Sequence, residues 1–179
     1  MITKWNFQTP TEEELHKRDR LASQLGLSPV VCLLLVQRGL TTVEEVKKFF
    51  KPSLNDLHDP FLMPDMEKAV KRLNKALGNK EKILIYGDYD VDGTTAVSLV
   101  YKYLRPYSSA LDYYIPDRYD EGYGISYKGI NYARENGITL VISLDCGIKA
   151  IEKIEYAKQL GIDFIICDHH MPDDTSSGM

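Results

Sequence analysis

Residues 83–95 read ILIYGDYDVDGTT, and this stretch decides how the rest of the chain is interpreted. Its apolar start predicts a buried strand that ends at Gly87, and three aspartates then stand at alternate positions, Asp88, Asp90 and Asp92. Carboxylates this close repel one another and raise each other's pKa unless a cation lies between them. The stretch therefore indicates either a solvated acidic turn or a site for a hard divalent metal ion.

Three known motifs overlap this stretch. An EF-hand calcium loop needs a glutamate where Leu99 stands and follows a helix rather than a strand, so we reject it. Residues 90–94, DVDGT, resemble the first motif of haloacid-dehalogenase-type phosphatases, in which Asp90 would be the nucleophile. The first motif of the DHH phosphoesterases is the third candidate. It requires a DHH triplet after a later strand, and residues 168–170 supply one.

The composition is that of a globular protein with one ordinary domain, or one domain and a smaller accessory piece. The chain has 179 residues, of which 44% are hydrophobic and 27% charged. Its formal net charge of −4 gives no basic signature, so composition alone does not indicate nucleic-acid binding.

Cellular location is inferred from the cysteines and the apolar runs. The three cysteines lack metal-ligand spacing and are expected to be reduced packing residues of a cytoplasmic protein: Cys32, Cys146 and Cys167. The opening residues are polar, so we expect no signal peptide. The longest apolar run, residues 29–36, is too short to span a bilayer, so we expect no membrane partner.

The pattern predicts two regions. Residues 1–64 form a small helical lead-in, with a capping box from Thr11 to Glu14, a second helix after Ser28 and a third over residues 42–51. Residues 65–179 form the main domain, in which strands and single helices alternate after an amphipathic helix over 65–78. This alternation predicts an α/β fold with a doubly wound, mostly parallel sheet. The expected strands are 82–87, 111–115, 139–144 and 163–167, and the helices about 93–105, 126–136 and 147–160.

Polar side chains follow every predicted strand, at the edge where open parallel sheets bind ligands. A lone aspartate at such a place is more often a helix N-cap, but clusters after four strands favour a metal site. Carboxylates combined with imidazoles favour Mn²⁺, and two such ions can assist the hydrolysis of a phosphoester. Three aspartates follow the first strand, and the residues that follow the other three strands are Pro116, Asp117, Arg118, Asp145, Asp168, His169 and His170.

Taken in order, the motifs YGDYDVDG, PDRYDEGYG, SLDCG and DHHMP resemble the DHH superfamily. The lead-in segments LGLSP and DPFLMPDMEKAVKRL make the resemblance closest to the RecJ-type exonucleases. The resemblance implies a cytoplasmic enzyme of DNA repair and recombination. It would digest single-stranded DNA in the 5′→3′ direction by attack of water, assisted by Mn²⁺ or Mg²⁺, with two ions in the complete enzyme. Single-stranded DNA is the implied partner, with a single-strand-binding protein or a helicase as further candidates.

Position in the motifs also implies residue roles. Asp92 and His170 are implied to be catalytic, and Asp168 either binds metal or orients a neighbouring histidine. Arg118 and Tyr123 are expected to hold a phosphate and to stack on a base. The implied metal ligands are Asp88, Asp90, Asp145 and His169.

The resemblance also has limits. Many superfamily members carry a histidine near the place of Tyr86, so we expect a different ligand shell there. The family has a further metal-binding aspartate after the triplet and a second domain that completes the nucleic-acid cleft. Neither fits after Pro172, so we expect a fragment that folds but has little or no activity alone.

Three alternatives stay open. The chain could be a DHH-type phosphodiesterase or pyrophosphatase acting on short oligonucleotides or nucleotides. It could be a dehalogenase-type phosphatase with Asp90 as nucleophile, although this leaves His169 and His170 without a role. It could also be a non-enzymatic binding scaffold with a vestigial acidic cluster, which failure to bind Mn²⁺ would favour.

Overall fold

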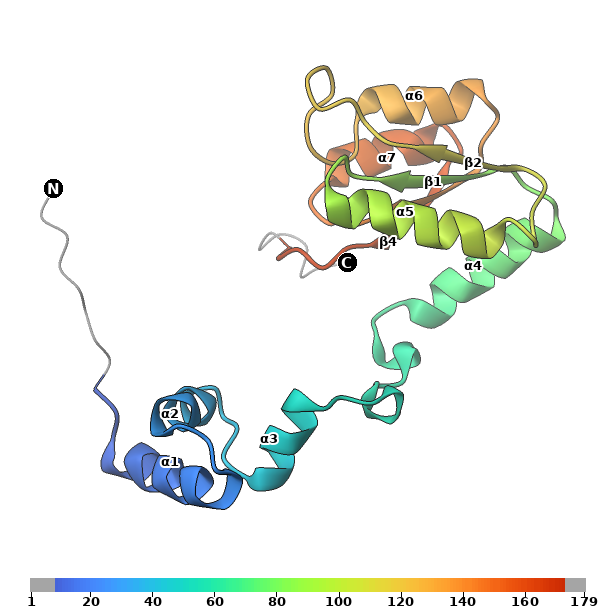
Figure 1. Ribbon diagram of the computed structural model, residues 1–179. Helices are drawn as coiled ribbons and strands as arrows, with labels where there is room; N and C mark the ends of the chain where they lie inside the picture. Colours follow the sequence, from blue (N-terminus) through green and yellow to red (C-terminus); the bar gives the residue numbers. More distant parts are fainter. Residues whose placement is uncertain (1–8, 173–179) are drawn as a thin grey trace, which may run out of the picture. The chain divides into compact units, whose positions relative to one another are not determined.

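The computed structural model describes residues 9–172 (Figure 1). The chain divides into two compact units between Pro60 and Phe61. Within the described range, no helix has both the length and the apolar character that crossing a bilayer requires. The predicted elements can therefore be compared with the structure one unit at a time.

The first unit contains the three expected helices, α1 (Glu12–Leu25), α2 (Pro29–Gln37) and α3 (Val43–Phe50). At the start of α1, the Thr11 hydroxyl accepts the Glu14 N–H and the Glu14 carboxylate accepts the Thr11 N–H, as the capping box predicted. Thr42 and Glu45 repeat this arrangement at the start of α3. The buried residues that hold the helices together are Leu21, Cys32, Leu35, Val36 and Val46.

Two short 3₁₀ turns follow, η1 (Leu54–Asp56) and η2 (Pro60–Leu62). They occupy the proline-rich stretch that the sequence indicated as a connection. The first α-helix of the second unit is α4 (Met66–Gly78), at the position of the predicted amphipathic helix.

The core of the second unit is a parallel sheet, as predicted. Its strands are β1 (Ile83–Gly87), β2 (Leu111–Tyr114), β3 (Leu140–Leu144) and β4 (Asp163–Cys167). They lie in the order β2-β1-β3-β4, and every neighbouring pair is parallel. The connecting helices are α5 (Val91–Leu104), α6 (Tyr127–Glu135) and α7 (Ile151–Gln159).

Side chains of the central strands alternate between two apolar clusters, one on each face of the sheet. On one face, Leu84, Tyr86 and Val141 pack with residues of α6 and α7. On the other face, Ile83 and Ile85 pack with residues of α4 and α5. Figure 1 shows α5 on the side of the sheet opposite α6 and α7, which makes the fold a three-layer, doubly wound arrangement.

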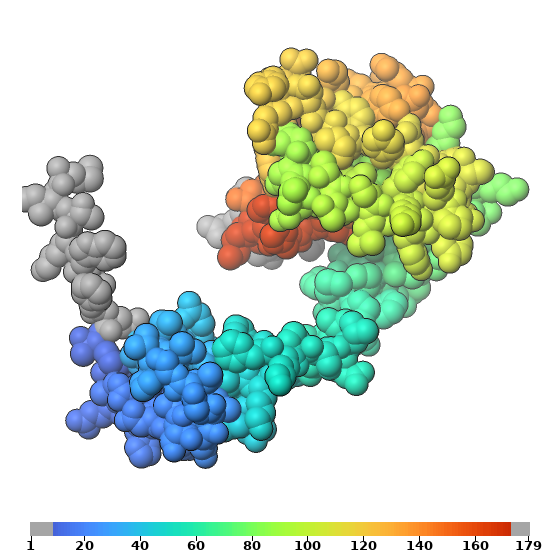
Figure 2. Space-filling model, viewed as in Figure 1, coloured from blue at the N-terminus to red at the C-terminus, as the bar shows by residue number. Residues whose placement is uncertain are grey.

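The outer strand β4 is only partly covered. Ile166 is 39% exposed, and Cys167 beside it is exposed too. Figure 2 shows the red atoms of this end of the described chain at the surface. The interpretation of all three cysteines as packing residues is therefore wrong for Cys167, because β4 pairs with β3 on one side and borders no other strand of the described sheet.

The strand order fixes where a ligand can bind. From β1 the chain moves outward to β2 and then returns to the other side of β1 to form β3. The connections that leave β1 and β3 at their carboxyl ends therefore diverge, and open α/β sheets bind their ligands in the crevice at this point. Asp88 directly follows β1 and Asp145 directly follows β3.

Candidate metal centre

The Asp88 carboxylate is buried at the end of β1. One of its oxygens accepts the N–H of Tyr89 at 2.6 Å, and the other accepts the N–H of Gly124 at 3.1 Å. Burial raises the pKa of Asp88, and the charges of Asp90 and Asp145 raise it further, while the two hydrogen bonds act in the opposite direction. A cation at this place would relieve the cost of keeping the carboxylate ionised.

Asp90 is the N-cap of α5, and its Oδ1 accepts the N–H of Gly93 at 2.9 Å. Because this cap starts the helix, α5 begins at Val91, two residues before the predicted start at Gly93. Gly93 is required for packing, since a Cβ there would lie 2.5 Å from the backbone nitrogen of Asp88. Asp92 lies exposed in the first turn of α5, so its catalytic role stays a prediction.

Asp145, after β3, has a left-handed backbone with φ +60°. A non-glycine residue in this region costs about 1–3 kcal/mol, and such strain clusters at functional sites. The Asp145 N–H donates to the carbonyl of Cys167 at 2.8 Å, which extends the β3–β4 pairing by one residue. Its Oδ1 lies 2.9 Å from Nε2 of His169. The ligand atoms of Asp145, His169 and His170 all lie within 4.8 Å of one another.

Asp168 holds His170 in place. Its Oδ1 lies 2.6 Å from Nδ1 of His170 and accepts the His170 N–H at 3.1 Å. Its Oδ2 accepts the N–H of Ile148 at 2.9 Å. The hydrogen bond to Asp168 raises the pKa of His170 and leaves Nε2 of the ring facing the site. These contacts favour the orienting role for Asp168 over metal ligation.

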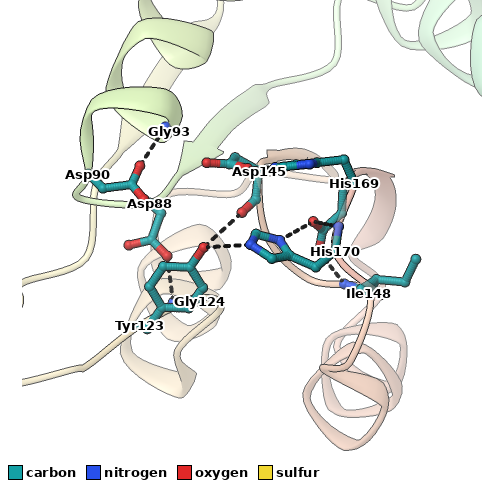
Figure 3. A network of polar contacts seen from close by, with 10 residues as sticks. Asp88, Asp90, Gly93, Tyr123, Gly124, Asp145, Ile148, His169 and His170 are labelled. Atoms are coloured by element: carbon teal, nitrogen blue, oxygen red, sulfur yellow. Dashed lines mark hydrogen bonds and ion pairs between the residues drawn. The ribbon is translucent and has the colours of Figure 1, made fainter. Parts of the chain in front are cut away.

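The loop after β2 reaches the same place (Figure 3). The Tyr123 hydroxyl lies 3.4 Å from Nε2 of His170 and 3.5 Å from the carbonyl of Asp145. Burial, together with the charges of Asp88, Asp145 and Asp90, raises the pKa of Tyr123 to about 12. This hydroxyl therefore stays protonated at neutral pH. It can donate a hydrogen bond to an oxygen of a ligand.

Arg118 lies further out on this loop, with its guanidinium 4.6 Å from the ring centre of Tyr89. It is exposed, and this stacking holds it over the loop of the first motif. A cavity of about 570 Å³ opens beside His170, with Tyr123 and Lys153 among its lining residues.

The donor set fits a divalent metal. A carboxylate oxygen of Asp145, after β3, and imidazole nitrogens of His169 and His170, after β4, lie within 4.8 Å of one another, and such a mixture is typical of Mn²⁺ and related ions. Asp88 and Asp90 stand at the same edge of the sheet but are not part of this group. Two groups behind the site were missed as functional candidates, the Tyr86 hydroxyl and the Glu121 carboxylate. The sequence does show a tyrosine within the buried strand β1 and an acidic residue inside the motif PDRYDEGYG. It does not show which groups these two side chains bond, so their place behind the site could not be predicted.

Comparison with known proteins identifies the family of the chain. Residues 82–178 match the DHH family, N-terminal domain. The chain is 41% identical over 169 residues to the single-stranded-DNA-specific exonuclease RecJ of Bacillus subtilis (strain 168), covering 94% of this chain and 21% of that protein. It is 34% identical over 151 residues to the RecJ of Escherichia coli (strain K12), covering 83% and 25%. The chain thus spans about a quarter or less of the length of these two relatives.

Solved structures agree with these matches. A crystal structure of exonuclease RecJ bound to manganese has a TM-score of 0.57 and 30% identity, covering 63% of this chain and 30% of that chain. RecJ in complex with Mn²⁺ from Thermus thermophilus has a TM-score of 0.65 over 89% of this chain and 22% of that chain, at 23% identity, which supports the fold. The family match over residues 82–178, together with the motifs and the parallel sheet, shows that this chain belongs to the DHH family.

Proposed function

We propose that this chain is the metal-binding part of a single-stranded-DNA-specific exonuclease, a hydrolase that uses Mn²⁺ or Mg²⁺. The observation that carries the proposal is the convergence of Asp145, His169 and His170 within 4.8 Å, at the sheet edge that also holds Asp88 and Asp90. The relatives named above are single-stranded-DNA-specific exonucleases, and solved RecJ structures contain Mn²⁺ or Mg²⁺.

In this proposal, Asp88, Asp90, Asp145 and His169 hold the metal, as the motif positions implied. A bound divalent ion would polarise the scissile phosphate and activate the attacking water. His170, oriented by Asp168, and the Tyr123 hydroxyl would bond the oxygens of the reacting phosphate. Their positions on the open side of the site support this assignment.

Arg118 and the cavity beside His170 would accommodate the DNA strand on either side of the reacting phosphate. Arg118 is exposed and presents a planar cation suited to a phosphate. The half-exposed ring of Tyr123 offers a stacking surface to an unpaired base. A cytoplasmic location accords with a DNA substrate, and a single-strand-binding protein or helicase is a further expected partner.

The test is hydrolysis with Mn²⁺ of 5′-phosphorylated single-stranded DNA, duplex DNA and a small phosphomonoester. It is run on this chain and on a chimera in which the chain replaces the matching segment of the B. subtilis RecJ. We expect digestion of the single strand, at least by the chimera, and its loss in His169→Ala. Exclusive hydrolysis of the phosphomonoester, unaffected by His169→Ala, would overturn the proposal in favour of a dehalogenase-type phosphatase.

A further inference from the structure

A buried tyrosine hydroxyl lies directly behind the candidate metal centre. Tyr86 is 1% exposed in β1, and its ring stacks on that of Tyr114 with centres 5.4 Å apart. Its hydroxyl accepts the N–H of Ser126 at 3.0 Å and donates to the carbonyl of Gly124 at 3.0 Å. One side chain thus ties the sheet to two residues of the loop after β2.

A carboxylate fastens the same loop from its other end. Glu121 accepts hydrogen bonds from the Tyr114 hydroxyl at 2.9 Å, from the Asp117 N–H at 2.9 Å and from the Ser126 hydroxyl. Burial acts to raise the pKa of Glu121, but these hydrogen bonds outweigh it and lower the pKa, so the carboxylate is ionised at neutral pH. The charge is satisfied by neutral donors within the loop and its neighbouring strand.

Gly124 connects this network to the metal centre. Its carbonyl is held by Tyr86, and its N–H donates to Oδ2 of Asp88 at 3.1 Å. Its backbone is left-handed, with φ +83°, which glycine adopts at no steric cost. The preceding residue, Tyr123, extends its hydroxyl toward His170. A displacement of Gly124 would therefore change both the orientation of the Asp88 carboxylate and the place of Tyr123.

We propose that Tyr86 and Glu121 are positioning residues of the metal centre, which act through Gly124 on Asp88 and through Tyr123 on the substrate side. This inference rests on the proposed function. Removing a group that orients a metal's ligands lowers metal affinity or activity by about 10- to 100-fold. A tyrosine hydroxyl that merely stabilised the core would leave metal affinity unchanged.

The chain offers a matched control at the opposite end of the sheet. The Tyr132 hydroxyl donates to Oδ2 of Asp112 at 2.6 Å, near the start of β2, and its ring packs against that of Tyr114. Tyr132→Phe and Tyr86→Phe thus remove the same atom from two rings that contact the same neighbour. Only Tyr86→Phe removes a hydrogen bond to Gly124, the residue whose N–H is bonded to Asp88.

The experiment measures the Mn²⁺ affinity of the chain by isothermal titration and by the signal of free Mn²⁺ in electron paramagnetic resonance, together with the melting temperature. We expect affinity to fall about tenfold or more in Tyr86→Phe and to stay within about twofold of the unsubstituted chain in Tyr132→Phe, while both lower the melting temperature. Glu121→Gln keeps the size of the side chain and gives a second, independent variant. We expect it to weaken Mn²⁺ binding as well, by a smaller factor.

Unchanged Mn²⁺ affinity in folded Tyr86→Phe and Glu121→Gln would overturn the positioning role and leave the proposed function standing. Equal losses in Tyr86→Phe and Tyr132→Phe would also overturn it, because the effect would then follow stability. If Tyr86→Phe does not fold, Glu121→Gln alone decides between these outcomes. Absence of Mn²⁺ binding in the unsubstituted chain would overturn the proposed function, and the positioning role with it.

Discussion

The two ends of the parallel sheet hold their charged groups in opposite ways. At the amino ends of the strands, Arg72 from α4 bonds Asp163 at 2.6 Å and Glu81 at 2.8 Å. Near the carboxyl ends, Asp88 and Asp90 are bonded by backbone N–H groups, and the Asp145 carboxylate contacts a ring nitrogen of His169. Acidic groups at the first end are neutralised by an arginine that the chain itself supplies, which serves stability. Those at the second end are the groups to which the proposed function assigns a metal ion.

The largest expected effect comes from removing ligands at the carboxyl end. In the chimera, we expect Asp145→Asn and His169→Ala to lower Mn²⁺-dependent hydrolysis of single-stranded DNA by about 1,000-fold, or roughly 4 kcal/mol in transition-state free energy. The matched controls Asp19→Asn and His58→Ala change exposed residues of the first unit and should leave the rate within about twofold. Full activity of His169→Ala would show that this imidazole is not part of the centre.

Metal binding should also stabilise the fold. At a Mn²⁺ concentration 100 times the dissociation constant, linkage predicts a gain of about 2.7 kcal/mol in the free energy of unfolding. Chemical denaturation with and without Mn²⁺ measures this gain. It should vanish in Asp145→Asn, and a similar gain in that variant would place the ion elsewhere.

Removing the ion pairs at the amino ends of the strands should lower the stability of the fold without affecting metal binding. Arg72→Met leaves Glu81 and Asp163 without their cation and should lower the free energy of unfolding by about 2 kcal/mol, less than for a fully buried pair because Asp163 is partly exposed. Lys71→Met breaks the exposed pair of Lys71 with Glu67 on the same helix and should cost below about 0.5 kcal/mol. Weaker Mn²⁺ binding by Arg72→Met would mean that the two ends are coupled.

The smallest effect concerns pH. The hydroxyl of Thr139 and then the guanidinium of Arg72 lower the pKa of Glu81 in the folded chain. A folded pKa below the unfolded one stabilises the fold above the unfolded value of about 4.3, and this contribution is lost as pH falls through the folded pKa. Compared with Glu81→Gln, the unsubstituted chain should be more stable at pH 7 by about 1 kcal/mol. Denaturation between pH 7 and pH 3 should show this difference shrinking below pH about 4, and a constant difference would contradict it.

The contrast between the two ends was only half visible in the sequence. The aspartates after β1 and β3 and the DHH triplet stand next to apolar runs, so their common edge follows from the geometry of parallel strands. The Arg72 network joins residues 72, 81 and 163, which no local pattern relates. Such a contact depends on how α4 packs on the sheet.

The sequence by itself determined the alternation of strands and helices, the capping boxes and the sheet edge where the motif residues gather. These follow from local periodicity, backbone preference and the single direction of parallel strands. The tertiary structure alone decided that Asp168 orients His170, that Asp145 takes a left-handed backbone and that Tyr86 and Glu121 hold the loop behind the centre. The first depends on the distant N–H of Ile148, which holds the Asp168 carboxylate, and the second on a backbone angle that the fold imposes. The third depends on the folding of the loop after β2 against Tyr86, which lies far from Gly124 in the sequence.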